Sequence, residues 1–137
     1  NPLSKLGKKF TMVVYVDSAV CSPCALGKLR FWNPLISEAK KERIDIDYVF
    51  ILSPKKEELE DVNMELEITD LQSSVYLDTE NIFQRSNVTI PKGQQYHSFL
   101  LDKEFNVILI GSPIEKEKIK CIYKNIISRK CKTKTVM

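Results

Sequence analysis

The chain has 137 residues, of which 43% are hydrophobic and 28% charged, and its formal net charge is +3. This size and balance fit one soluble globular domain and exclude a small disulfide scaffold. Lysines are spread along the chain instead of gathering with aromatic side chains, so no nucleic-acid partner is indicated. No apolar run approaches the roughly 20 residues that a membrane-spanning helix needs.

The first third of the chain predicts a lead-in, a strand and a helix. Residues 1–9 are polar and basic, and we expect no firm structure there. Phe10 to Val16 is an apolar, β-branched run that predicts a central strand covered on both faces. Apolar residues at three- and four-residue intervals predict a helix from Ser22 to about Arg43, which Pro34 should kink or break near Asn33.

The middle of the chain predicts two further strands and two helices. Ile44 to Leu52 alternates in a way that places its even-numbered residues on one face of a strand. Ser53 and Pro54 form a cap and a first helical position, so we expect a helix that runs to about Glu67. A short strand and a short helix should follow, at Val75 to Leu77 and at Thr79 to Asn87.

The last third predicts a loop, a hairpin and a helix. The loop spans Val88 to Tyr96, and the hairpin strands span His97 to Asp102 and Asn106 to Gly111. Ser112 and Glu115 form a capping-box pattern that should start the last helix. Its apolar face should consist of Ile119, Ile122, Tyr123, Ile126 and Ile127.

This order of elements predicts an α/β fold with a central mixed β-sheet of about five strands flanked by helices on both faces. We expect a lead-in over residues 1–9, one domain over residues 10–128 and a basic tail over residues 129–137. The aromatic side chains of Phe31, Trp32 and Tyr48 should belong to the core.

Cys21-Ser22-Pro23-Cys24 is the motif that carries chemistry, because it stands between the first strand and the following helix. Two cysteines at this spacing can close a small disulfide, and unpaired N–H groups at a helix start lower the pKa of the first thiol. Cys21 is then the attacking thiolate and Cys24 the thiol that resolves a mixed disulfide. Pro23 fixes one dihedral between them. The plain alternative is a pair of small core residues at a helix start.

The remaining cysteines, Cys121 and Cys131, lie ten residues apart near the far end of the chain. Structural zinc needs four close ligands, and this spacing makes a zinc site an unfavourable alternative. We interpret both cysteines as non-catalytic. Cys121 should lie near the surface, and a disulfide between the two stays open because the geometry is uncertain.

Residues from Phe10 to Ile127 resemble the thioredoxin-like thiol-disulfide oxidoreductases of bacterial envelopes, in the TlpA/ResA-like branch. The resemblance rests on the strand before Cys21 and Cys24, the helix after them, and the downstream hairpin that begins at His97. It implies a thioredoxin-like fold, dithiol-disulfide exchange with protein thiols, and a periplasmic or cell-envelope location rather than a cytoplasmic one. It implies no cofactor.

Four positions depart from the pattern of these proteins. Val20 stands where they have an aromatic residue before the first cysteine, and Leu29 stands where they have a proline. Tyr96 takes the place of their cis-proline, and a non-proline cis bond costs about 2.5–4 kcal/mol, so we expect the Gln95-Tyr96 peptide to be trans. Tyr15 takes the place of a buried acid, and Asp17 at the end of the strand is its nearest substitute. Asp17 as a simple turn residue is the alternative.

His97 follows the position of the cis-proline and could face the cysteines. Cys21, Cys24 and His97 would then make a soft copper site of the kind found in Sco-like metallochaperones, although those have a longer cysteine spacing. A satisfied or exposed histidine at a strand start is the plain alternative. Ser22, Val20, Gln95 and Tyr96 are expected neighbours of the site.

We therefore predict an oxidoreductase that exchanges a Cys21–Cys24 disulfide with protein thiols. A thioredoxin-fold binding module without turnover and a copper-handling protein are the alternatives. The chain begins at Asn1 without methionine, which is compatible with a processed product, with a lipid anchor upstream, or with an arbitrary boundary.

Overall fold

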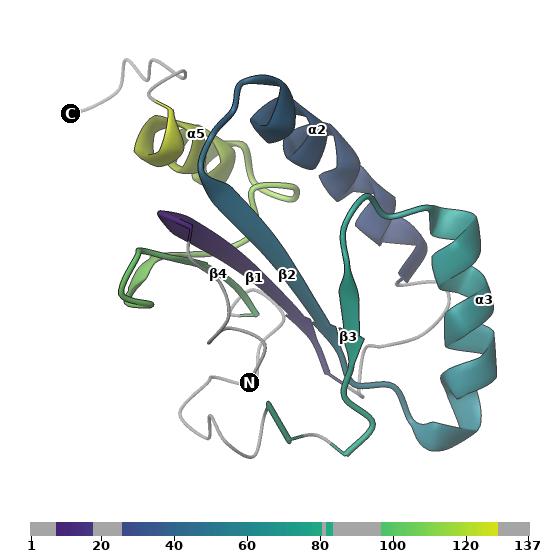
Figure 1. Ribbon diagram of the computed structural model, residues 1–137. Helices are drawn as coiled ribbons and strands as arrows, with labels where there is room; N and C mark the ends of the chain where they lie inside the picture. Colours follow the sequence, from purple (N-terminus) through teal and green to yellow (C-terminus); the bar gives the residue numbers. More distant parts are fainter. Residues whose placement is uncertain (1–7, 18–25, 81, 84–96, 129–137) are drawn as a thin grey trace.

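The sheet forms the centre of the molecule in the computed structural model, which describes residues 8–17, 26–80, 82–83 and 97–128. Five strands lie in the order β3-β2-β1-β4-β5 (Figure 1). The first three strands are parallel, whereas β4 is antiparallel to β1 and β5 is antiparallel to β4. The predicted α/β class and mixed five-strand sheet are confirmed. The strands are β1 (Phe10–Val16), β2 (Ile46–Leu52), β3 (Val75–Leu77), β4 (Ser98–Leu101) and β5 (Val107–Ile110).

The helix after the cysteine motif changes its winding where the sequence predicts a break. Its first part is a 3-10 helix, η2 (Gly27–Trp32), and α2 (Asn33–Lys41) continues from it. Pro34 falls in the first turn of α2, where its missing N–H leaves no helical hydrogen bond unmade. The remaining helices are η3 (Lys56–Glu58), α3 (Leu59–Thr69) and α5 (Glu117–Ile127).

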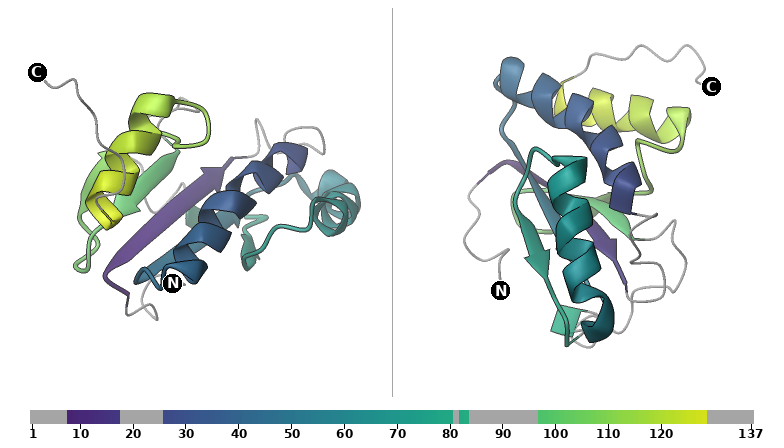
Figure 2. Two further views of the ribbon diagram at one scale, coloured as in Figure 1. Left: turned by 90° about the horizontal axis from the view of Figure 1, so that it is seen from above. Right: turned by 90° about the vertical axis from the view of Figure 1, so that its right-hand side faces the viewer.

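The alternation of side chains along β1 divides the core into two clusters. Met12, Val14 and Val16 face a large cluster to which α2, α3 and α5 all contribute. Val13 and Tyr15 face a smaller cluster on the other side of the sheet, where Phe83 packs. All seven residues of β1 are buried, which confirms a central strand covered on both faces. Figure 2 shows α2 and α5 next to one another, with α3 farther from α5.

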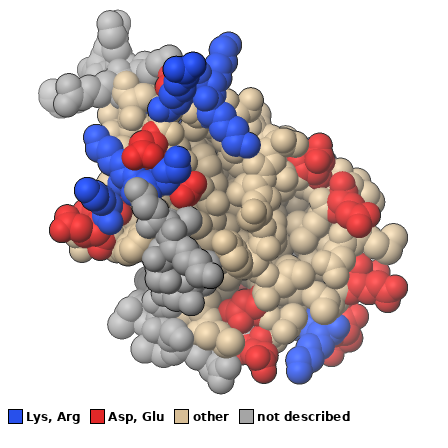
Figure 3. Space-filling model, viewed as in Figure 1, with Lys and Arg blue, Asp and Glu red and all other residues tan. Residues whose placement is uncertain are grey.

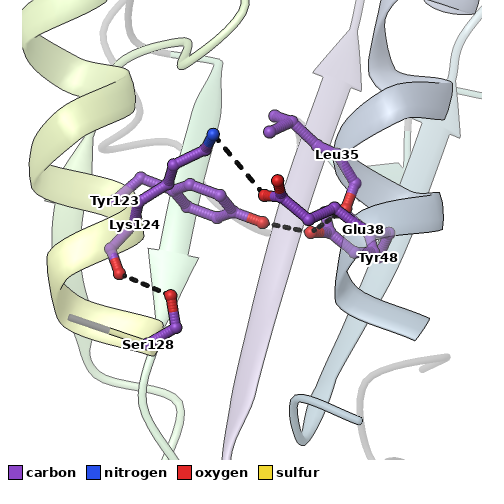
Figure 4. A network of polar contacts seen from close by, with 6 residues as sticks. All are labelled: Leu35, Glu38, Tyr48, Tyr123, Lys124 and Ser128. Carbon is purple, nitrogen blue, oxygen red and sulfur yellow. Dashed lines mark hydrogen bonds and ion pairs between the residues drawn. The ribbon is translucent and has the colours of Figure 1, made fainter. Parts of the chain in front are cut away.

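A polar network joins α2, β2 and α5 at the edge of the large cluster (Figure 4). The hydroxyls of Tyr48 and Tyr123 are hydrogen-bonded to each other, and the Tyr48 hydroxyl also donates to the Leu35 carbonyl at 3.5 Å. Lys124 of α5 forms an ion pair with Glu38 of α2 at 3.5 Å. Burial raises the pKa of Tyr48 to about 12, and it raises the pKa of Tyr123 in the same direction. The two tyrosines therefore stay neutral and keep their hydrogen bond.

Both predicted serine caps are wrong. The Ser53 N–H donates to the Val16 carbonyl at 2.9 Å, which continues the strand pairing, so the chain stays extended through Lys55. Ser112 accepts a hydrogen bond from the Ile114 N–H at 3.2 Å, but this closes a turn, and α5 begins five residues later. At Ser53 the pairing with β1 fixes the backbone before a helix can start, whereas the hydrogen bonds of Ser112 are local.

Two predicted core residues are exposed. The side chain of Phe31 is 50% exposed on η2, whereas its neighbour Trp32 is buried as predicted. Ile122 on α5 is 44% exposed, while Tyr123 beside it is buried. The 3-10 winding of η2 has three residues per turn, so the pattern predicted for an α-helix does not hold there.

Candidate functional site

The site predicted from the sequence lies only partly within the described residues. Cys21 and Cys24 lie outside them, and so do their predicted neighbours Val20, Ser22, Pro23, Gln95 and Tyr96. The structure describes Asp17, which precedes Cys21 by four residues, and His97, which follows Tyr96 directly. These two residues lie at the carboxyl end of β1 and the amino end of β4.

Asp17 and His97 lie side by side because β1 and β4 are antiparallel. Val14 pairs with Ser98, and the Tyr15 N–H donates to the His97 carbonyl at 2.8 Å, which extends the pairing by one step. The Nδ1 atom of His97 is 3.9 Å from Oδ2 of Asp17. This separation is within the range of an ion pair and too long for a hydrogen bond. Eighty residues of sequence separate the two side chains.

His97 is buried, with 4% of its surface exposed, and its Nδ1 atom has no hydrogen-bond partner among the described residues. The exposed alternative for this residue is therefore wrong. The side chain of Asp17 is 16% exposed, so the pair has one buried and one partly hydrated member. A buried imidazole with an open nitrogen can accept a proton, and a carboxylate beside it stabilises the charged form that results.

Tyr15 supports His97 from the smaller core cluster. Its ring lies edge-on to the imidazole, with centroids 5.3 Å apart, and the ring of Phe83 lies against it at 4.8 Å. The Ser53 hydroxyl lies 3.5 Å from the Tyr15 hydroxyl. Asp78 holds Phe83 in place, because its carboxylate accepts hydrogen bonds from the N–H groups of Ile82 and Phe83. Tyr15, which stands where the resemblance expects a buried acid, is thus fully buried and packs against aromatic rings.

A groove runs beside the helix that follows the cysteine motif. One part, of about 480 Å³, lies between the ends of β1 and β4, η2 and the turn before α5. A second part, of about 570 Å³, continues between α2 and α5, and Phe31 and Ile114 line both. Val14, Val16 and Leu29 give the first part an apolar floor, and Lys28 and Glu115 place opposite charges among its lining side chains.

A larger hollow of about 780 Å³ lies at the opposite end of the sheet. Its lining includes Ile46 at the start of β2, with Asp45 and Lys8 beside it. Lys8 and Asp45 form an ion pair at 3.6 Å, which uses charges that could otherwise face a ligand. The volume of a hollow is therefore not enough to identify a functional site in this molecule.

Cys121 on α5 is disulfide-bonded, and its partner lies outside the described residues. This agrees with a non-catalytic cysteine. Within the described part of the chain, no three His, Cys, Asp or Glu side chains group in a way that could hold a metal ion. The copper hypothesis needs Cys21 and Cys24, which lie outside that part, so it stays untested. None of the described helices is long and apolar enough to cross a membrane.

The sequence offers Asp17 and His97 as separate candidates for separate roles, and their closeness in space is a finding of the structure. The hairpin pattern and the buried run of β1 carried the missing signal, since antiparallel pairing of the two strands brings their ends together. Nothing in the sequence predicts that the Ser53 hydroxyl lies near Tyr15, because Ser53-Pro54 has the pattern of a helix cap.

Similar solved structures share this fold. The thioredoxin domain of a thiol-disulfide oxidoreductase from Bacteroides vulgatus superposes with a TM-score of 0.66 and 15% identity over 92% of this chain and 84% of that one. A thioredoxin-like protein in its oxidised form gives 0.62 and 14% over 90% and 82%. StoA from Bacillus subtilis gives 0.57 and 16% over 79% and 75%. No family profile and no curated protein matches the sequence. The resemblance drawn from the sequence is confirmed at the level of the fold.

Proposed function

We propose that this thioredoxin-like chain is a thiol-disulfide oxidoreductase whose exchanging pair is Cys21 and Cys24. The observation that carries the proposal is the carboxyl end of β1. There, a buried strand of this fold ends beside the Asp17 carboxylate and the His97 imidazole, and Cys21 follows Asp17 by four residues in the sequence. Solved structures with this fold include proteins described as thiol-disulfide oxidoreductases.

The reaction can be written with its atoms and electrons in balance. The Cys21 thiolate attacks a disulfide of a substrate protein, which forms a mixed disulfide and releases one substrate thiolate. The Cys24 thiol loses its proton and attacks the Cys21 sulfur, which closes the protein disulfide and releases the second substrate thiolate. The cysteine pair is oxidised by two electrons, and the substrate disulfide is reduced to two thiols.

We place this activity in the periplasm or cell envelope. Disulfides persist in oxidising compartments and are rare in the cytosol, and Cys121 takes part in one. If Cys21 and Cys24 pair with each other, Cys131 remains as the partner of Cys121. This assignment separates a structural disulfide on α5 from an exchanging disulfide after β1.

The groove beside η2 is the surface on which we place the substrate chain. It starts at the ends of β1 and β4, and η2 follows Cys24 by three residues. The exposed Phe31 ring offers an apolar contact midway along it. We expect an apolar segment of the substrate protein to lie there while its sulfur is joined to Cys21.

The test is trapping of the mixed disulfide. Cys24→Ser removes the resolving thiol, so the Cys21 adduct with a substrate protein should accumulate and be visible on non-reducing gels. Cys21→Ser should trap nothing, and the double variant Cys121→Ser with Cys131→Ser, which leaves no unpaired thiol behind, is the control for adducts on other cysteines. The rate of Cys21 alkylation at pH 7 should also exceed that of a free thiol.

A different result would contradict the proposal. If Cys24→Ser traps no adduct with reduced or oxidised envelope proteins, and Cys21 alkylates no faster than free cysteine, the chain is a binding module without turnover. Measurement of the reduction potential of the pair then separates a reductant, an oxidant and an inert structural bridge.

A further inference from the structure

We propose that the pocket between α2 and α5 binds a segment of a partner protein in which an acidic residue stands next to an apolar one. The inference rests on the proposed function, because it names the chemistry of the substrate chain that would lie in the second part of the groove. The residues that line this pocket all belong to the described part of the chain, and none of them is a cysteine.

The apolar part of the lining comes mainly from one side of the helix that follows the cysteine motif. Pro34 and Leu35 stand three and four residues after Phe31, a spacing that places them on the same side of a helix. Ile114, in the turn before α5, adds a further apolar side chain. Leu35 is buried, whereas half of the Phe31 surface is exposed. An apolar side chain packed against Phe31 would remove this ring from water.

The charged side chains around the pocket leave an excess of positive charge. Lys124 forms an ion pair with Glu38 at 3.5 Å, so these two charges offset each other (Figure 4). Lys120, one turn earlier on α5, also lines the pocket and is half-buried, and it forms no ion pair with a described residue. Arg30 adds a second cation, because its guanidinium carbon lies 5.1 Å from the centre of the Phe31 ring.

These apolar and charged side chains together specify the chemistry of the occupant. The half-buried ammonium of Lys120 has lost part of its hydration, and a carboxylate beside it would replace that loss with a charge-assisted hydrogen bond. A basic segment would be repelled, and a wholly apolar one would leave the lysine without a counter-charge. The volume of about 570 Å³ is in the range of pockets that hold small ligands, which suits a few side chains of an extended segment.

The side of the molecule formed by α3 would repel the same acidic segment. That helix has Glu60 and Asp61 in its first turn and no basic side chain in its last. Figure 3 shows acidic side chains along this side and basic ones near the end where α2 and α5 lie. The uneven charge would therefore direct an acidic segment toward α5 before contact is made.

The experiment measures the binding of defined peptides in the absence of disulfide exchange. The protein carries Cys21→Ser and Cys24→Ser, so no mixed disulfide can form at the motif, and its amide NMR signals are followed during titration. The probes are cysteine-free peptides of about ten residues with a central Leu-Leu pair, followed by Asp, Asn or Lys. The Asp peptide should bind most tightly and should shift the signals of Phe31, Leu35 and Lys120 more than those of α3.

Lys120→Gln should lower the affinity for the Asp peptide about three- to five-fold and leave that for the Asn peptide unchanged, because a partly exposed charge pair contributes about this much. Added salt should weaken only the Asp peptide, through screening of the same charge pair. Lys118→Gln is the matched control, since it removes an exposed lysine of α5 that does not line the pocket. Phe31→Ala should weaken the peptides to a similar degree, because it removes apolar contact and no charge.

Any of three results would overturn the inference. The Asp peptide binds no more tightly than the Asn peptide or not at all, the two lysine variants lose affinity equally, or the largest shifts fall outside α2 and α5. Failure of the proposed function looks different, because Cys24→Ser would then trap no adduct while the Asp peptide still bound beside Lys120.

Discussion

At the scale of single residues, the described part of the chain has two buried side-chain atoms without hydrogen-bond partners, Oγ1 of Thr11 and Nδ1 of His97. They lie at opposite ends of β1, and both residues are buried. His97 has a carboxylate at 3.9 Å and an ionisable ring. Thr11 has neither, and its hydroxyl is simply a cost to stability.

Thr11→Val should therefore stabilise the fold. Valine has the same branched shape and no hydroxyl, so the substitution removes an unsatisfied polar atom without leaving a cavity. The free energy of unfolding in urea should rise by about 1 kcal/mol. A lower value would mean that the hydroxyl has a partner that matters, such as an ordered water.

At the scale of elements, the strands and the hairpin could be predicted from the sequence, while the helix starts could not. β1 and β3 match their predicted bounds because a buried apolar run needs only its own side chains to be recognised. Asp102 pins the hairpin turn, since its carboxylate accepts hydrogen bonds from the N–H groups of Glu104 and Asn106. Ser53 is not a cap because its N–H pairs with the distant Val16 carbonyl, which a local pattern does not contain. The Ser112 hydroxyl accepts from the Ile114 N–H in a turn and does not cap α5.

The contact between α2 and α5 predicts a loss of stability at alkaline pH. An unfolded tyrosine titrates near pH 10, whereas burial raises the pKa of folded Tyr48 to about 12. Between these values the unfolded chain has lost a proton that the folded chain keeps, so the free energy of unfolding falls as pH rises. The contribution is fully present below pH 10 and is lost as the pH passes 12.

Tyr48→Phe should make this alkaline decline shallower in urea unfolding measured between pH 9 and pH 12. At neutral pH the same variant should be less stable by about 1–3 kcal/mol, because the Tyr123 hydroxyl loses its partner in a buried site. Tyr76→Phe, on the exposed face of β3, is the matched control. An unchanged alkaline slope in Tyr48→Phe would show that other groups govern this range.

The groove between η2, α2 and α5 predicts a role for an exposed ring. Phe31→Ala should raise KM for a protein disulfide several-fold and leave kcat and the rate with a small aromatic disulfide unchanged, since only a long substrate reaches the groove. Ile68→Ala, which removes an exposed apolar side chain from α3, is the control. Equal effects of the two variants on KM would exclude the groove as the substrate surface.

At the scale of the whole molecule, the strand order brings Asp17 and His97 together, and the charged side chains are unevenly spread over the surface. The order β3-β2-β1-β4-β5 places β1 at the centre, so the ends of β1 and β4 meet where the cysteine segment leaves the sheet. On the face drawn in Figure 3, basic side chains gather near the end of the molecule where α2 and α5 lie, and acidic side chains lie along the side formed by α3. The α/β class could be predicted from element order, but the meeting of Asp17 and His97 could be predicted only with the strand pairing in hand.

The disulfide of Cys121 can accept two electrons from a reductant, in addition to any that a bridge between Cys21 and Cys24 accepts. A dithiol reductant added in excess would open the bridge on α5 as well as any bridge between Cys21 and Cys24. The protein would then consume more than one molar equivalent of the reductant. A titration by single equivalents should instead show two steps, of which the first belongs to the more easily reduced bridge. Protein taken after the first step has one bridge open and the other closed, so a rate measured on it can be assigned to a single pair of cysteines.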